Sequence, residues 1–189
     1  MATSREPVRL ALRNLWSEHI IWTHQYIVAA VAGTPDAKAA AGRLLKNQED
    51  IGQAIVSFYG ESAGQRLTEL LKEHILIAVD LIEAAKSADD AAFGTHDQRW
   101  SDNVAEIARF LAGANPNWPE QDVLDLLNLH LQLTKGSVVA RLKADWAGDV
   151  KALDDIFTEA MVIADTLYDG LVAQFPERFG VSAPVATGA

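Results

Sequence analysis

The sequence has no cysteine among its 189 residues. Disulfide bonds and thiolate metal sites are therefore excluded, while the redox compartment is left open. Basic residues are also scarce, because 16 Lys and Arg stand against 26 Asp and Glu and give a formal charge of -10. This acidic balance argues against nucleic acid and anionic membrane surfaces as partners, since both would be repelled.

Long apolar runs and strand patterns are missing as well. No run approaches the roughly 20 apolar residues of a membrane span, and nothing near the N-terminus resembles a signal peptide. No segment alternates polar and apolar residues between hairpin turns, so we predict no strands. With 49% hydrophobic residues the chain can bury one substantial core. We expect a soluble, cytoplasmic, all-α protein.

What the sequence does contain is helical periodicity. The clearest segment is 60–86, where Leu67, Leu70, His74 and Ile77 recur at steps of three and four residues. Comparable stripes elsewhere bring the total to six expected helices, at about 7–32, 35–58, 60–86, 90–113, 120–143 and 149–173. Short turns between them favour a single, mainly antiparallel six-helix bundle.

Three turns carry signals for helix ends. Thr34 is the expected N-cap of the second helix, with Pro35 at its first position. Ser62 is expected to cap the third helix, and Trp146-Ala147-Gly148 to break the chain before the sixth. Residues 1–179 then form one domain, followed by a flexible tail over 180–189.

The two halves of the chain resemble diverged copies. Leu15-Trp16-Ser17-Glu18-His19 aligns with Arg99-Trp100-Ser101-Asp102-Asn103, and further matches occur at offsets of about 82 to 85. These offsets predict an internal repeat of three helices, with halves at about 5–88 and 89–175.

One polar residue falls near the middle of each inward-facing stripe. The six residues are His19, Asn47, His74, Asn103, His130 and Glu159, separated by 27 to 29 positions. Helix midpoints share one height in an up-and-down bundle. We therefore expect these side chains to form one polar layer halfway along the molecule.

Such a layer has two interpretations. Histidine and carboxylate side chains on facing helices are how bundles hold iron, manganese or zinc, which would serve storage, sensing or small-molecule activation. The expected ligands are His19, His74, His130 and Glu159, with Asn47, Asp50, Asn103 and Glu18 orienting or supplementing them. Alternatively the layer is a closed hydrogen-bond network in a non-catalytic interaction or scaffold protein. Whether the protein is an enzyme or a homodimer stays open.

A third hypothesis concerns the aromatic residues. Trp16, Trp22, Tyr26 and Trp100 fall on or near inner stripes and are candidates for lining a small-molecule pocket. Packing of the bundle is the other explanation for them.

The runs LWSEHIIWTHQYI, RLLKNQEDIGQAI, FYGESAGQRLTELLKEHILIAVDLI, ANPNWP and LLNLHLQLT resemble a family of small, uncharacterised, all-helical bacterial and archaeal proteins. The resemblance covers nearly the whole chain before the tail. Some members of that family are labelled glycosyltransferases, but this sequence has no D-x-D motif and no Rossmann-like region. The chain is also similar in style to repeated E-H helical domains that bind metal in their cores, which implies a metal site by analogy.

Overall fold

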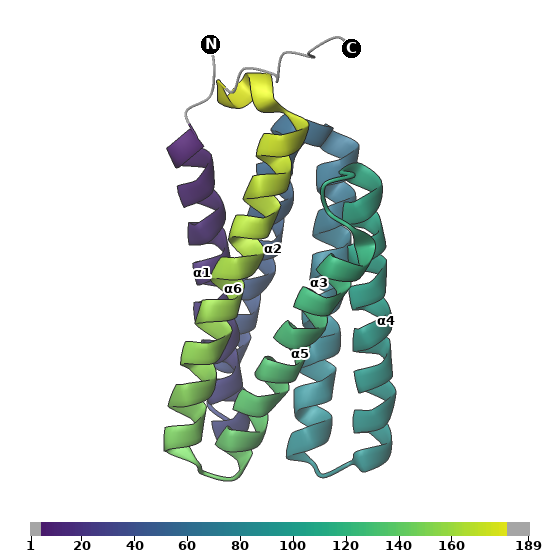
Figure 1. Cartoon of the computed structure of the whole chain (residues 1–189). Helices are drawn as coiled ribbons and strands as arrows, with labels where there is room; N and C mark the ends of the chain where they lie inside the picture. Colours follow the sequence, from purple (N-terminus) through teal and green to yellow (C-terminus); the bar gives the residue numbers. More distant parts are fainter. Residues whose placement is uncertain (1–4, 181–189) are drawn as a thin grey trace.

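The computed structural model describes residues 5–180, and it confirms an all-α bundle. Within these residues there are no strands. The elements are α1 (Arg5–Ala32), α2 (Ala37–Tyr59), α3 (Glu61–Lys86), α4 (Asp90–Ala114), α5 (Glu120–Leu142), α6 (Trp146–Gln174) and the short 3-10 helix η1 (Pro176–Phe179). Successive helices run in opposite directions along the bundle (Figure 1). The expected tail lies outside the described residues except for Gly180.

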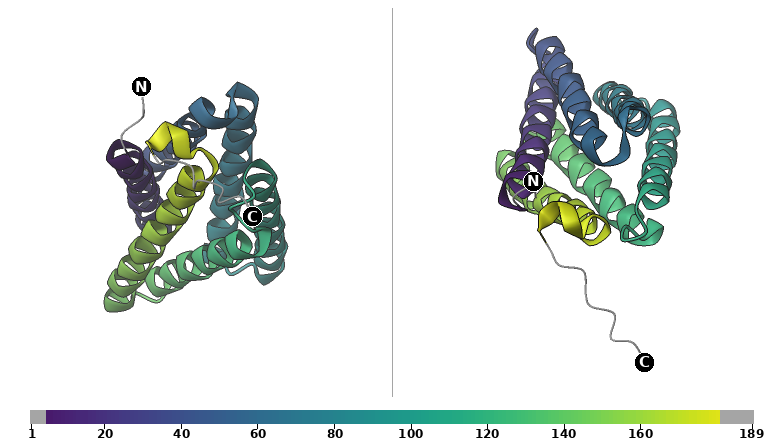
Figure 2. Two further views of the ribbon diagram at one scale, coloured as in Figure 1. Left: turned by 45° about the horizontal axis from the view of Figure 1, so that its top comes forward. Right: turned by 90° about the horizontal axis from the view of Figure 1, so that it is seen from above.

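The six helices form a closed ring. Each helix packs against the next in sequence, and α6 returns to pack against α1. Helix α1 also contacts α3 and α5. The view along the bundle in Figure 2 shows this arrangement. The main apolar core receives residues from every helix, which is what wide apolar stripes of helical period require.

Three of the expected helix starts differ from the structure. Helix α2 begins at Ala37 after Asp36, and the Thr34 hydroxyl donates instead to the carbonyl of Ala29 at 3.3 Å. Ser62 is already inside α3, which follows Gly60. Residues 146–148 do not lie in a break between helices but form the first turn of α6, because the Asp145 side chain accepts a hydrogen bond from Gly148 N at 2.9 Å.

One turn geometry occurs three times at the same end of the bundle. Gly33, Ala88 and Ala144 have left-handed φ angles of 68°, 55° and 54°. The next residue in each turn donates its N–H to the carbonyl five positions back, at 2.9 to 3.0 Å. This pairing, with the accompanying bond from the left-handed residue itself, is the Schellman helix ending.

These turns lie 55 and 56 residues apart. Each turn joins the two helices of one hairpin, so the hairpins are α1–α2, α3–α4 and α5–α6. The turn geometry therefore recurs in each of three two-helix hairpins. It does not show the expected three-helix halves at 5–88 and 89–175.

Candidate functional site

All six residues of the expected polar layer are buried. None has more than 6% of its surface exposed. The glutamine next to Asn47, Gln48, is fully buried as well. A buried polar group must find a hydrogen-bond partner or destabilise the fold, so the partners of these side chains decide what the layer is.

The same histidine contact recurs in every hairpin. His74 Nδ1 lies 3.0 Å from Asn103 Oδ1, and His130 Nδ1 lies 2.9 Å from Glu159 Oε2. In the first hairpin, His19 Nδ1 lies 3.2 Å from the amide nitrogen of Gln48. Each partner is 29 residues beyond its histidine.

Gln48 is the residue that sequence reasoning missed. The fixed spacing of 29 residues between each histidine and its partner would have identified it. Asn47, the expected member, instead donates to the carbonyl of Leu15 at 3.0 Å. Asn103 makes the matching bond to the carbonyl of Leu70 at 3.1 Å. These amides fasten the second helix of a hairpin to the first, one turn before the histidine.

The partners determine where each ring carries its proton. Asn103 Oδ1 and Glu159 Oε2 are acceptors, so Nδ1 of His74 and of His130 donates, and in the neutral ring of His74 the Nε2 atom keeps its lone pair. The Gln48 amide nitrogen is a donor, so Nδ1 of His19 is the unprotonated atom and its proton lies on Nε2.

The rings of His19 and His74 are neutral at physiological pH. Burial, then the neighbouring His130 and His74, keeps the pKa of His19 well below its usual range. Burial and then His130 lower the pKa of His74 to about 3, against a raising contribution from the Asn103 hydrogen bond. A neutral imidazole is the form that ligates metals.

The three histidines come from three different hairpins and line one cavity. The ring centres of His19 and His130 are 5.5 Å apart, and Trp100 covers His74 with its ring centre at 5.1 Å. The volume open to the centre of a water molecule is about 20 Å³, whereas one water needs roughly 10–15 Å³. The cavity therefore has room for one small occupant.

Two oxygens of the layer have no partner within residues 5–180. Glu159 Oε1 and Gln48 Oε1 are both fully buried and make no hydrogen bond there. An unpaired buried acceptor costs about 1–3 kcal/mol. These two oxygens are the positions in the layer where a bound ligand or a water molecule could make a further contact.

The expected coordination shell is not assembled. Within residues 5–180, no three His, Asp or Glu side chains lie close enough to hold one metal ion. His19, His74 and His130 share a cavity, but Glu159 reaches the site through His130 and not beside it.

The expected supporting carboxylates lie elsewhere. Glu18 pairs with Arg43, and Asp50 pairs with Lys46 at 2.9 Å, both on the partly exposed outside of α1 and α2. Neither makes a contact with a histidine of the layer. Asn47 and Asn103 are the supporting residues that do lie in the layer.

The four aromatic candidates do not share one pocket. Tyr26 and Trp100 line the histidine cavity. Trp16 lines a separate apolar chamber, although its edge meets the rings of His19 and His130 at 5.4 and 6.3 Å between ring centres. Trp22 lies in an outer groove, with the Arg43 guanidinium 5.6 Å from its ring centre.

A second buried polar cluster was not expected from the sequence. Asp149, at the start of α6, accepts from the Ser137 hydroxyl at 2.9 Å and from Arg141 at 3.2 Å, and it contacts His24 Nε2 at 3.2 Å. Ser137 contacts Asp149 and not His24, so this is not the order of a catalytic triad. The cluster ties α1, α5 and α6 together near the hairpin turns.

Comparison with known proteins gives no assignment. No family model, no curated protein and no solved structure matches the chain. The resemblance to a family of uncharacterised helical proteins therefore stays a prediction. Between residues 5 and 180, no helix is both long enough and apolar enough to cross a membrane.

Proposed function

We propose that the protein binds one divalent transition metal ion, zinc, iron or manganese, in the cavity lined by His19, His74 and His130. The observation that carries the proposal is the convergence of three buried imidazoles from three hairpins on a single small space. Imidazole nitrogen is a preferred ligand for these metals.

The outer contacts of the rings support the same proposal. A metal-bound histidine almost always donates its other N–H to a carboxylate or carbonyl oxygen, which fixes the ring and raises its basicity. His130 donates to Glu159 and His74 donates to the amide oxygen of Asn103. The lone pair on Nε2 of the neutral His74 ring is then available to an ion, and a metal ion on Nε2 of His130 would take the place of any proton there.

Metal uptake requires a local rearrangement. Among residues 5–180, no three donor groups stand at metal distance, and His19 carries its proton on Nε2 because Gln48 donates toward Nδ1. Binding would therefore move at least one ring and release or relocate the His19 proton. A divalent ion would also offset the buried charge of Glu159, whose Oε1 has no partner in the described residues.

The test is metal content and affinity of tag-free protein after treatment with a chelator. Reconstitution with Zn²⁺ or Co²⁺ should give one ion per chain, a higher melting temperature and, for Co²⁺, the visible absorption of a low-coordinate site. His130→Asn should abolish uptake. The matched control is His96→Asn, because His96 lies on the outer face of α4 near Arg99.

A second candidate is a scaffold protein in which the layer only specifies packing. The observation that favours it is that each Nδ1 has a polar contact within its own hairpin. Apolar replacement of such a network is often neutral or stabilising. Absence of stoichiometric metal, together with a His74→Leu variant at least as stable as the wild type, would select this function over the metal site.

A further inference from the structure

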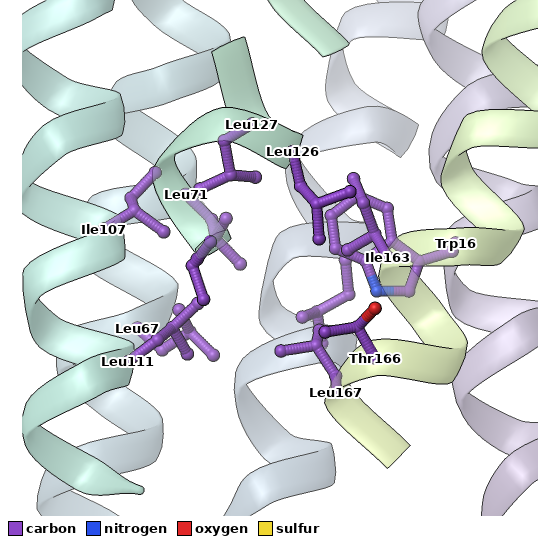
Figure 3. A pocket seen from close by; sticks show the side chains of 12 residues that line it. Trp16, Leu67, Leu71, Ile107, Leu111, Leu126, Leu127, Ile163, Thr166 and Leu167 are labelled. Atoms are coloured by element: carbon purple, nitrogen blue, oxygen red, sulfur yellow. The ribbon is translucent and has the colours of Figure 1, made fainter. Parts of the chain in front are cut away.

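A mainly apolar chamber lies beside the histidine layer. Its larger lobe has about 40 Å³ open to the centre of a water molecule, and apart from Trp16 and Thr166 it is lined by aliphatic side chains. Figure 3 shows the surrounding side chains, among them Trp16, Leu67, Leu111 and Leu167. All six helices contribute to this wall.

A second lobe of about 30 Å³ lies next to the first. The two lobes share five lining side chains, which are Trp16, Ile51, Leu67, Leu111 and Leu167. A buried water needs two to four polar partners, more than the Trp16 and Thr166 side chains offer, so a void of this kind favours apolar molecules. Empty volume in a core also lowers stability, so an occupant would recover part of that loss.

The size of the chamber limits its occupant. One water needs roughly 10–15 Å³ of such space, and an engineered cavity that holds benzene measures roughly 150 Å³. The lobes of about 40 and 30 Å³ lie between these values. They fit molecules of one or two heavy atoms.

Trp16 connects the chamber to the histidines. Its indole lines both lobes, and its edge packs against His19 and His130, whose rings line the neighbouring cavity. A molecule held in the chamber is therefore separated from the histidine cavity by one side chain.

We propose that this chamber binds a small apolar gas molecule of the size of dioxygen or nitric oxide. Such a molecule would also be the one to reach the histidine site, and this part rests on the proposed metal function. Binding in the chamber itself needs no metal, because its wall contains no histidine.

Methyl NMR of metal-free, chelator-treated protein under dioxygen pressure tests the chamber directly. Dissolved dioxygen is paramagnetic, so a bound population speeds the relaxation of the methyl groups around it. The methyls of Ile51, Leu67 and Leu111 should relax faster than the equally buried methyls of Ile27 and Val138, which belong to a separate apolar cluster. Equal enhancement in both groups would overturn the proposal.

Two changes of opposite sign complete the test. Val123→Leu fills the larger lobe and should reduce the dioxygen effect and xenon uptake severalfold, whereas Val138→Leu, the same change on the same helix outside the chamber, should leave both unchanged. Leu111→Ala enlarges both lobes and should increase xenon uptake. Unchanged uptake in a folded Val123→Leu protein, or in Leu111→Ala, would refute the chamber, even if the protein binds metal as proposed.

Discussion

His130 Nδ1 lies 2.9 Å from Glu159 Oε2, with both side chains 4% exposed, while the second carboxylate oxygen of Glu159 has no partner in the described residues. The carboxylate thus has one contact where it can accept several hydrogen bonds. Glu159 therefore acts on the neighbouring cavity through its contact with the His130 ring.

Replacing this carboxylate should separate stability from metal binding. Glu159→Gln keeps an oxygen for His130 Nδ1 at nearly the same side-chain volume, so metal-free protein should keep its stability to within about 1 kcal/mol. Its affinity for Zn²⁺ should fall by roughly 10- to 100-fold, as for other outer-shell changes. Urea unfolding and calorimetric titration measure the two effects.

Glu73→Gln is the control, because Glu73 is exposed on α3. It should change neither quantity. A metal-free Glu159→Gln protein that is clearly less stable than the wild type would contradict this account of the pair.

Acid should destabilise the protein in a window set by the buried histidines. Burial lowers the pKa of His74 to about 3 and that of His19 well below its usual range, while both titrate near 6.5 in the unfolded chain. The unfolded state then binds more protons, so stability is full above pH 6.5 and falls as the pH drops toward 3. The slope is at most about 1.4 kcal/mol per pH unit for each group.

The diagnostic range is pH 6.5 to 5, where few carboxylates titrate. Urea unfolding of metal-free protein should show a smaller slope there for His74→Leu than for wild type. His96→Asn should keep the wild-type slope. An unchanged slope in His74→Leu would mean that His74 is not held neutral by the fold.

The contact between α2 and α3 should depend on two glycines. A Cβ atom at Gly52 would stand 1.9 Å from Thr68 Oγ1 and 2.6 Å from the carbonyl oxygen of Gly64. Gly52→Ala should therefore force the helices apart and destabilise the protein by roughly 1–3 kcal/mol.

Gly42 provides the opposite control in the same helix. A Cβ atom there meets nothing within 4 Å, so Gly42→Ala should stabilise the protein by about 0.5–1 kcal/mol through helix propensity. Chemical denaturation of both variants would decide, and a neutral Gly52→Ala change would show that the two helices are not in such close contact.

The hairpin turns predict a pair of reciprocal substitutions. Ala88 and Ala144 adopt left-handed φ angles, which cost a non-glycine residue roughly 1–2 kcal/mol. Ala88→Gly and Ala144→Gly should each raise stability by about 1 kcal/mol. Gly33→Ala at the equivalent turn should lower it by a similar amount, and thermal unfolding of the three variants checks the set. Ala88→Gly serves as the sharpest case, since a loss of stability there would exclude backbone strain at the turn.

Much of the fold was predictable because burial in helices is a local property of the sequence. The spacing of Leu67, Leu70 and His74 places them on one face of α3 whatever the neighbouring helices do, and all three are buried. The helix starts were less certain. Asp145 caps α6 through a side-chain hydrogen bond from Gly148 N, and the spacing of the apolar residues does not predict this bond.

The site was predictable only in its composition. Periodicity indicates that a residue faces inward, but it does not say toward which neighbour, so Gln48 was overlooked beside Asn47 although Gln48 is the one that contacts His19. For the same reason Trp16 and Trp22 looked alike in sequence, whereas one lies in the core and the other in an outer groove.

The structure does not show the predicted three-helix repeat, and the recurrences it does show have a different length. The turns and the histidine pairs recur every 55 or 56 residues, but few residue identities are kept between the hairpins. The three hairpins resemble one another in their hydrogen-bond geometry more than in the identity of their side chains. The left-handed residue at the turn is glycine in one hairpin and alanine in the other two.

The histidine contacts close within single hairpins, over 29 residues, whereas the space between the rings arises only when all three hairpins come together. Each hairpin can therefore orient its own imidazole before the three hairpins pack together, because contacts that are close in sequence form quickly. A ligand in that space therefore binds only the assembled protein and no single hairpin. A higher ligand concentration would consequently make separation of the hairpins rarer. The lifetime of the folded chain would then depend on the supply of the ligand.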